Sequence, residues 1–310
     1  MSIFSGTAHP ELSREIVRHL GVELGDLKIT RFADSEIYVK FEQSVRGTEA
    51  FIIQPTCQPI DSNLLELLIL LDALKRASAD MITVVLPYYG YARQEKKDAP
   101  REPITAKLIA NLLTTAGAQR IVAMDLHADA IQGFFDIPVD HLTALPIIAD
   151  YLAEKHYEDV VVVSPDEGRV KKVRKIASRL RAPLAVGYKV HPEHGVSEIT
   201  GLAGDVRGKT CIVYDDMIST GGSINEIVDA LLRNGARPEI TVACTHAVLA
   251  GPAVERLSRP EIKELILTDT IPVPPEKRSA KTTVLSTAPL FAQAIRRIWT
   301  DESVSELFTD

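Results

Sequence analysis

The sequence predicts an α/β protein with mainly parallel sheets, arranged in two domains. Short runs rich in β-branched residues carry no polar alternation, which is typical of strands covered on both faces. Longer helical patterns separate these runs, and helical connections indicate parallel strands. At 310 residues the chain is longer than one average domain, which favours two.

Buried strands are predicted where the apolar runs occur. In the first part of the chain these are residues 50–55, 82–87 and 120–127, and in the second part they are residues 160–166, 210–216, 240–246 and 264–270. Between them, Asp61 is predicted to be the N-cap of a helix rich in leucine. Gly117 and Gly235 are predicted to end their helices, because glycine tolerates the left-handed conformation found there.

Two segments of the chain resemble each other. LLTTAGAQRIVAMDLH (112–127) and LLRNGARPEITVACTH (231–246) both run from a helix through Gly-Ala to a strand that ends in histidine. Chance likeness between αβ units is the alternative, but the pair favours a duplication. We expect a boundary near Leu145-Pro146, giving domains 1–144 and 145–310. The last helix is a candidate to pack back on the N-terminal domain.

Composition excludes several classes of function. The net charge of -7 argues against a nucleic-acid or anionic-membrane surface, since either would need a basic face. Cys57, Cys211 and Cys244 are scattered and odd in number, which indicates buried thiols in a reducing compartment. The N-terminus lacks the basic and apolar regions of a signal peptide, and no apolar run could span a bilayer. The sequence therefore predicts a soluble, cytoplasmic protein.

The stretch IVYDDMISTGGSI (212–224) combines an apolar run, two carboxylates and a turn rich in donors. A glycine-rich turn that leads into a helix exposes backbone N–H groups and the positive end of the helix dipole, which suits a phosphate. Asp215 and Asp216 would instead accept hydrogen bonds from sugar hydroxyls or hold a divalent cation. A phosphorylated sugar fits both halves of the stretch. An aspartate-rich strand end that merely caps a helix is the structural alternative.

A hydrophobic run followed by DDMISTGGS is similar to the phosphoribosyl-binding loop of the phosphoribosyltransferase fold. Further motifs occur along the chain in one order, and with this loop they resemble the ribose-phosphate pyrophosphokinase family. They are RFADSEIYV (31–39), PYYGYARQEKK (87–97), REPITAKLIANLL (101–113), DLHADAIQGFF (125–135), VSPDEG (163–168), THAVLAGPA (245–253) and VSELF (304–308). The resemblance implies duplicated phosphoribosyltransferase-type domains. The first would serve ATP and oligomer contacts, and the second would bind ribose 5-phosphate.

The resemblance also implies a reaction. The β,γ-diphosphoryl group of Mg-ATP would move to the C1 hydroxyl of ribose 5-phosphate, releasing AMP and phosphoribosyl diphosphate. His127 and Asp166 match metal-binding positions for Mg²⁺. The implied ATP-binding residues are Phe32, Asp34, Ser35, Glu36, Arg93 and Gln94, the first four in a loop supplied by a neighbouring subunit. The implied ribose 5-phosphate residues are Asp215, Asp216, Ser219, Thr220, Gly221, Gly222, Ser223 and His191.

Lys189 matches the catalytic lysine of a loop in this family, where it would stabilise the transferring diphosphoryl group. His191 stands where the family has arginine, and imidazole is mostly neutral at pH 7. Arg169 stands where a small residue is common, so it would either contact a phosphate or crowd the ribose site. These departures leave a non-catalytic or weakly active regulatory paralogue as an alternative. A third alternative is a phosphoribosyltransferase that consumes the diphosphate, but such an enzyme would not explain the motifs RFADSE and YARQ.

Regulation and assembly are implied by the same resemblance. A homo-oligomer is expected, a hexamer by likeness to the hexameric class, with no nucleic-acid or membrane partner. Positions that correspond to phosphate- or ADP-binding regions at subunit contacts are Ser44, Arg46, Arg101, Ser303 and Ser305. Ordinary surface roles are the alternative for all of them.

Overall fold

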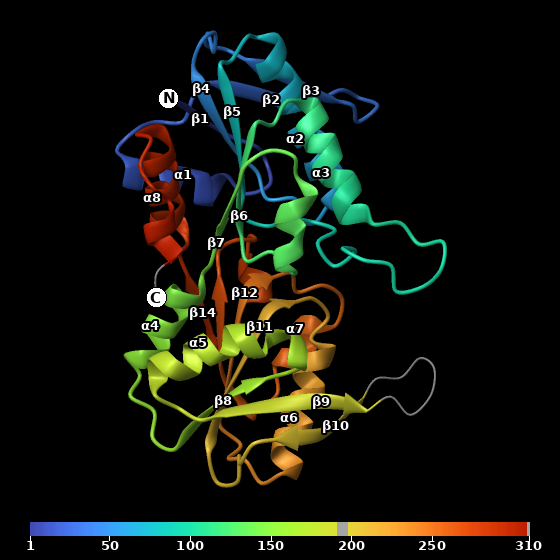
Figure 1. Ribbon diagram of the computed structural model, residues 1–310, viewed down its shortest axis with the longest axis vertical. Coiled ribbons are helices and arrows are strands. Elements are labelled where there is room, and N and C mark those ends of the chain that lie inside the picture. The colour runs from blue at the N-terminus through green and yellow to red at the C-terminus, as the bar shows by residue number, and fades with distance from the viewer. Residues whose placement is uncertain (191–197, 309–310) are drawn as a thin grey trace. The chain divides into compact units, whose positions relative to one another are not determined.

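A computed structural model describes residues 1–190 and 198–308 and divides the chain into two compact units. Unit 1 comprises residues 1–143, 270–272 and 287–310, and unit 2 comprises residues 144–269 and 273–286. Each unit is built on its own sheet (Figure 1). None of the described helices is long and apolar enough to cross a membrane.

The sheet of unit 1 is entirely parallel. Its order is β1 (Ser2–Ser5), β4 (Glu49–Ile53), β5 (Met81–Leu86), β6 (Arg120–Met124) and β7 (Val139–Leu142). The central strands are almost wholly buried, because helices cover both faces. An antiparallel hairpin of β2 (Leu27–Arg31) and β3 (Ile37–Phe41) stands beside this sheet.

Four α-helices complete unit 1. They are α1 (Pro10–Leu20), α2 (Ile60–Arg76), α3 (Thr105–Ala116) and α8 (Ala288–Trp299), and the short 3₁₀ helices are η1 (Asp129–Phe134) and η4 (Ser305–Phe308). Helices α1 and α8 pack side by side although they stand at opposite ends of the sequence (Figure 1). Arg296 donates to the His19 carbonyl across this contact at 3.2 Å. The C-terminal helix therefore belongs to the same unit as the N-terminus.

The sheet of unit 2 carries the predicted sugar-phosphate loop. Its order is β10 (Glu198–Ala203), β9 (Leu184–Val190), β8 (Val160–Ser164), β11 (Thr210–Ile218), β12 (Ile240–Ala247), β13 (Ile262–Thr268) and β14 (Thr282–Leu285). Only the β9–β10 pair is antiparallel among these described strands. The helices are α4 (Leu145–Ala153), α5 (Val170–Leu180), α6 (Gly222–Arg233) and α7 (Ala253–Leu257), with the 3₁₀ helices η2 (Glu167–Arg169) and η3 (Pro275–Lys277).

The predicted fold class is confirmed, with mainly parallel sheets in an α/β arrangement. The two similar segments occupy equivalent places, since α3–β6 and α6–β12 each lead into a strand flanked by parallel neighbours. Gly117 caps α3 as predicted, with a φ of 133°. In α6 the cap is Asn234, and Gly235 follows it with a φ of 81°.

Two local predictions are wrong. Asp61 is not the N-cap of α2, because the helix begins at Ile60 and Pro59 occupies the cap. The Asp61 carboxylate instead accepts a hydrogen bond from the Tyr91 hydroxyl. The strand predicted over 120–127 ends at Met124, because Asp125 adopts a φ of 37° and turns the chain. His127 therefore lies in the loop beyond the strand.

Candidate functional site

The glycine-rich turn connects β11 to α6 in unit 2. Strand β11 runs to Ile218, two residues further than predicted, and pairs with β12 as far as Ala247. The turn occupies residues 219–221, and Gly222 begins the helix. Gly221 has a φ of 72°, a conformation that glycine adopts at little cost and other residues rarely take. The turn therefore depends on glycine at this position.

The carbonyl groups of the turn are held by the protein. Leu249 and Ala250 donate their main-chain N–H groups to the carbonyls of Ile218 and Ser219, at 3.0 Å and 2.9 Å. Arg256, in α7, donates to the Thr220 carbonyl at 3.0 Å. By contrast, the main-chain N–H groups of Thr220, Gly221 and Gly222 donate to no residue in the described ranges. The turn therefore presents open donors at the positive end of α6, an arrangement suited to an anion.

Asp215 and Asp216 lie within β11, just before the turn, and Arg169 contacts both. Arg169 Nε lies 3.2 Å from Asp215 Oδ1 and 2.9 Å from Asp216 Oδ1. The side chains are 14% exposed for Arg169, 13% for Asp215 and 1% for Asp216. The Asp216 N–H also donates to Asp215 Oδ1 at 2.8 Å. The two carboxylates thus form one charge cluster closed by a guanidinium.

Burial and the charges within this cluster shift the pKa values of Asp215 and Arg169. Burial, and then the neighbouring charge of Asp216, raise the pKa of the Asp215 carboxyl well above its ordinary value, while Arg169 lowers it in part. Burial alone would lower the pKa of Arg169, but the charges of Asp216, Asp215 and Asp166 outweigh burial and raise it. Arg169 therefore remains charged and is the main counter-ion of the pair.

Asp166 and His127, the predicted metal ligands, follow strands of different units. Asp166 precedes η2, and its carbonyl accepts from Ser164 Oγ at 2.6 Å. His127 follows β6, where the neighbouring Leu126 N–H donates to His141 Nε2 at 2.8 Å. Across the ranges 1–190 and 198–308, no three His, Cys, Asp or Glu side chains are grouped closely enough to hold a metal. The metal site stays a prediction.

The predicted base-binding loop, residues 32–36, forms the tight connection between β2 and β3. The Phe32 N–H donates to the Glu36 carbonyl at 2.9 Å, and the Glu36 N–H donates to Asp34 Oδ1 at 3.2 Å. Ser35 has a φ of 76°. Phe32 is 56% exposed, and its ring meets the Tyr38 ring edge-on with 5.6 Å between the two ring centroids. An aromatic face this exposed in unit 1 is available to a base, so Phe32 is not a core residue.

Arg93 and Gln94 lie on the exposed connection between β5 and α3. Gln94 is fixed by Thr105 Oγ1, which donates to Gln94 Oε1 at 2.5 Å, and its carbonyl accepts from the Ala106 N–H at 3.2 Å. Arg93 is exposed and has no ion pair with a residue in the described part of the chain. Its guanidinium is therefore available to phosphate oxygens, which it would hold through two parallel hydrogen bonds.

The remaining predicted residues divide by position. Ser44, Arg46, Arg101, Ser303 and Ser305 are all exposed in unit 1. Arg46 donates to Ser78 Oγ at 3.2 Å, and the Ser305 N–H donates to Ser303 Oγ at 3.3 Å. Lys189 lies near the end of β9, paired in register with Ile199 of β10. His191 lies outside the described residues.

Two basic residues at the site escaped sequence reasoning. Arg169 was recognised only as a departure from the family pattern, and its contact with both aspartates depends on the path of η2 beside β11. Arg256 was not predicted at all. It is brought to the turn by α7, and nothing in the local sequence signals that contact.

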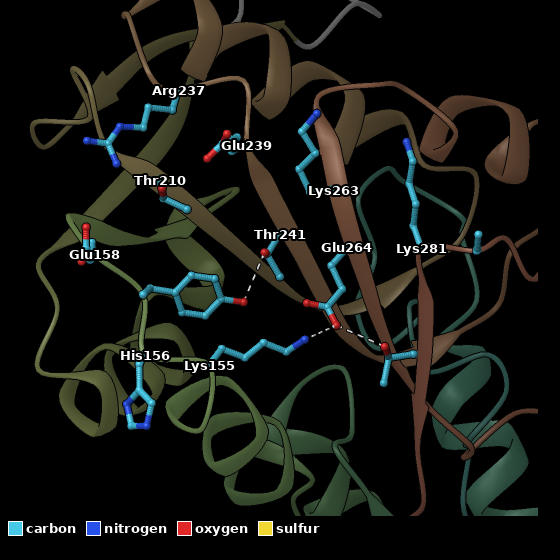
Figure 2. A pocket seen from close by; sticks show the side chains of 13 residues that line it. Lys155, His156, Glu158, Thr210, Arg237, Glu239, Thr241, Lys263, Glu264 and Lys281 are labelled. Atoms are coloured by element: carbon cyan, nitrogen blue, oxygen red, sulfur yellow. Dashed lines mark hydrogen bonds and ion pairs between the residues drawn. The ribbon is translucent and has the colours of Figure 1, made fainter.

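A separate pocket of about 730 Å³ lies at the amino ends of β11, β12, β13 and β14, opposite the turn (Figure 2). Several of its charged groups are already paired. Lys155 reaches across to Glu264 at 2.8 Å (Figure 2). Arg237 pairs with Asp159, outside the lining, at 3.2 Å. Lys281 donates to the Arg259 carbonyl at 2.8 Å. No predicted site residue lines this pocket, and we assign neither substrate to it.

The Glu264 cluster at this pocket gives an expected pH dependence. Burial would raise the pKa of the Glu264 carboxyl, but hydrogen bonds from Lys155, Tyr151 and Thr283 and the charge of Lys155 lower it below 4.5. A lowered native pKa stabilises the fold above the unfolded pKa, and this contribution is lost as the pH falls through the native value. Replacing Glu264 by glutamine should therefore lower the free energy of unfolding at neutral pH. Below about pH 4 the same replacement should lower it by a smaller amount.

Urea unfolding of the Glu264→Gln variant and the parent between about pH 3 and pH 7 measures this difference. Glu239→Gln is the control, since Glu239 is exposed at the same pocket. A stability difference for Glu264→Gln that stays constant across the range would contradict the expectation.

Comparisons with known proteins match sequence in both units of the chain. A family model described as the N-terminal domain of ribose phosphate pyrophosphokinase matches residues 1–117, and one described as a phosphoribosyl synthetase-associated domain matches residues 198–309. Ribose-phosphate pyrophosphokinases of Bacillus subtilis and Caldanaerobacter subterraneus are 51% and 53% identical, over 100% of this chain and 97% and 98% of theirs.

Among solved structures, phosphoribosylpyrophosphate synthetase from Mycobacterium smegmatis matches with a TM-score of 0.91 and 48% identity. The match covers 97% of this chain and 99% of that one. Likeness of this extent, in sequence over the whole chain and in structure over nearly all of it, shows that the chain belongs to the ribose-phosphate pyrophosphokinase family.

Proposed function

We propose that this protein transfers the β,γ-diphosphoryl group of Mg-ATP to the C1 hydroxyl of ribose 5-phosphate, giving phosphoribosyl diphosphate and AMP. The observation that carries the proposal is the turn at 219–221, with open main-chain donors beside paired carboxylates. Relatives about as long as this chain bear the name of that enzyme. None of them favours the regulatory alternative.

In the proposed complex the 5-phosphate of the sugar occupies the turn. The N–H groups of Thr220, Gly221 and Gly222 would bind its oxygens, with the hydroxyls of Ser219, Thr220 and Ser223 as further donors. Arg256, already on the Thr220 carbonyl, adds a positive charge at the same turn. Asp215 and Asp216 would accept from the ribose hydroxyls, which orients C1 away from the turn.

For ATP, the proposed contacts are those of unit 1. From the loop of a neighbouring subunit, Phe32 would stack on adenine and Asp34 and Glu36 would accept from the ribose, whereas Arg93 would bind phosphate oxygens. Asp166 and His127 are each proposed as a ligand of Mg²⁺, with substrate oxygens as further ligands. The donor set fits, because Mg²⁺ takes few protein ligands and relies on phosphates. When bound, the metal would neutralise charge that shifts as the α,β bridge breaks.

Lys189, near the end of β9, would stabilise the transferring group electrostatically, since a lysine ammonium is a compact positive charge. Attack by the C1 hydroxyl on the β-phosphorus of ATP would form the new O–P bond, the bond from the β-phosphorus to the bridging oxygen would break with its electrons going to AMP, and the hydroxyl proton would be released to water. The fixed carboxylates and the turn contribute by holding the sugar in position for in-line attack.

An assay with Mg-ATP and ribose 5-phosphate tests the proposal. AMP and phosphoribosyl diphosphate should appear in equal amounts and only when both substrates are present. Absence of AMP throughout the range from about pH 6 to about pH 9 would sink it, because that range covers both protonation states of a histidine such as His191. Formation of ADP instead would point to transfer of a single phosphoryl group.

We further propose a cytoplasmic homo-oligomer. None of the described cysteines forms a disulfide and all three are buried, which suits a reducing compartment. Helices α2 and α3 pack together in unit 1, and these helices and the N-cap residue of α3 carry a set of exposed apolar side chains. These are Leu65, Ile104, Leu108 and Leu112, exposed by 53%, 38%, 52% and 38%. We propose that a second copy of the chain covers this face.

The double variant Leu108→Asp/Leu112→Asp is expected to lower the oligomeric state, because buried unpaired carboxylates oppose association. Light scattering after size-exclusion chromatography measures the mass. Val22→Asp is the matched control, since Val22 is also 38% exposed but stands apart, after α1. An unchanged mass for the double variant would place the interface elsewhere.

A further inference from the structure

Arg169 already occupies the carboxylates that the sugar needs. Its Nε donates to Asp215 Oδ1 at 3.2 Å and lies 2.9 Å from Asp216 Oδ1. Asp215 Oδ1 also accepts from the Asp216 N–H at 2.8 Å, so this oxygen is fully used before any ligand arrives. A ribose hydroxyl that approaches the Oδ1 atom of either aspartate therefore meets an existing interaction with Arg169.

The low exposure of Asp215 and Asp216 determines whether a sugar hydroxyl can reach them while Arg169 is in contact with them. Asp216 is 1% exposed and Asp215 13% exposed while the guanidinium lies against them. A hydroxyl oxygen needs to approach within about 2.5–3.0 Å of a carboxylate oxygen to donate to it. An acceptor as enclosed as Asp216 cannot be reached in this way until a neighbouring group moves.

The position of Arg169 in the chain makes it the group that can move. It ends η2, a single 3₁₀ turn, and stands directly before α5. Asp215 and Asp216 are held by the ladder between β11 and β12 on one side of the site. The guanidinium is joined to its backbone by a flexible chain of methylene groups, whereas the aspartates have short side chains on a paired strand.

We propose that Arg169 is an internal competitor of ribose 5-phosphate. In the ligand-free protein it neutralises Asp215 and Asp216, and the sugar hydroxyls bind after displacing it from at least one of them. The inference rests on the proposed function, since it takes these aspartates as the sugar-binding carboxylates. As a consequence, the protein binds ribose 5-phosphate less tightly than the same site would without Arg169. In return for this lower affinity, the ligand-free site is more stable.

Removing the competitor tests the inference. Arg169→Ala should bind ribose 5-phosphate at least about tenfold more tightly than the parent, measured by isothermal titration calorimetry without ATP. Its unfolding temperature should fall in the absence of the sugar and recover when the sugar is added, because the ligand then satisfies the carboxylates. In the full assay the KM for ribose 5-phosphate should fall and the KM for ATP should stay the same.

Two further variants keep the test decisive. Arg174→Ala removes the same charge from an exposed position on α5 and should leave sugar affinity unchanged. Arg169→Lys keeps a charge but loses the Nε donor, and it should bind the sugar with intermediate affinity; it also serves if Arg169→Ala does not fold.

Parental or weaker affinity in the Arg169 variants, with the parent binding normally, would overturn the inference and leave the proposed function intact. If the parent itself fails to bind ribose 5-phosphate, the sugar assignment of the aspartates is wrong and the inference falls with it.

Discussion

Replacing Gly221 by valine is expected to raise the KM for ribose 5-phosphate by about 100-fold, through the loss of charge-assisted hydrogen bonds in the turn. Gly221 has a φ of 72°, which is a rare and strained conformation for a β-branched residue. The first side-chain carbon at this position would already be in van der Waals contact with Arg256 Cβ at 3.5 Å and Ala253 Cα at 3.6 Å, so the two methyl groups of valine add bulk beside α7. The turn would shift, and its N–H groups would no longer converge on one phosphate.

Gly208→Val is the matched control for this experiment. Gly208 also has a positive φ, 68°, but an added side-chain carbon would meet nothing within 4 Å. It precedes β11 and is far in sequence from the turn. Both variants therefore carry the backbone strain, and only Gly221→Val should lose the sugar phosphate. ATP binding should be unchanged in both. Equal KM values for ribose 5-phosphate in the two variants would contradict the role of the turn.

The fold class and the turn could be predicted from sequence for the same reason. Strands such as β5 and β12 are buried on both faces, so their composition alone marks them. The turn is marked by Gly221 and Gly222 between an apolar run and an amphipathic helix. Local sequence determines local structure at these places.

Other features were hidden because they depend on contacts distant in sequence. The hairpin strands β2 and β3 are partly exposed, and β1, β7 and β14 are too short to show a pattern. Arg169 reaches Asp215 across 46 positions of sequence, and Arg256 reaches Thr220 across 36. No periodicity or motif carries such information, so the closure of the carboxylates by a guanidinium emerged only from the structure.

Replacing Lys189 by methionine is expected to lower kcat by about 100- to 1000-fold, the usual effect of removing one preorganised electrostatic group from a transition state. Methionine keeps the approximate length and apolar stem of lysine and removes the charge. Lys189 lies near the end of β9, in register with Ile199, so its main chain is anchored by a strand pair. Since the charge acts on the transferring diphosphoryl group, the KM values for both substrates should change little.

Two comparisons make this prediction specific. Lys189→Arg keeps a positive charge and should retain more activity than Lys189→Met, because part of the stabilisation depends on charge alone. Lys263→Met removes an exposed lysine from β13, at the pocket opposite the turn, and should leave kcat unchanged. A kcat for Lys189→Met within about threefold of the parent would mean that less than 1 kcal/mol of transition-state stabilisation depends on this residue. In that case the catalytic charge must come from another cation, and Arg93 is the first to replace, since it has no ion pair in the described chain.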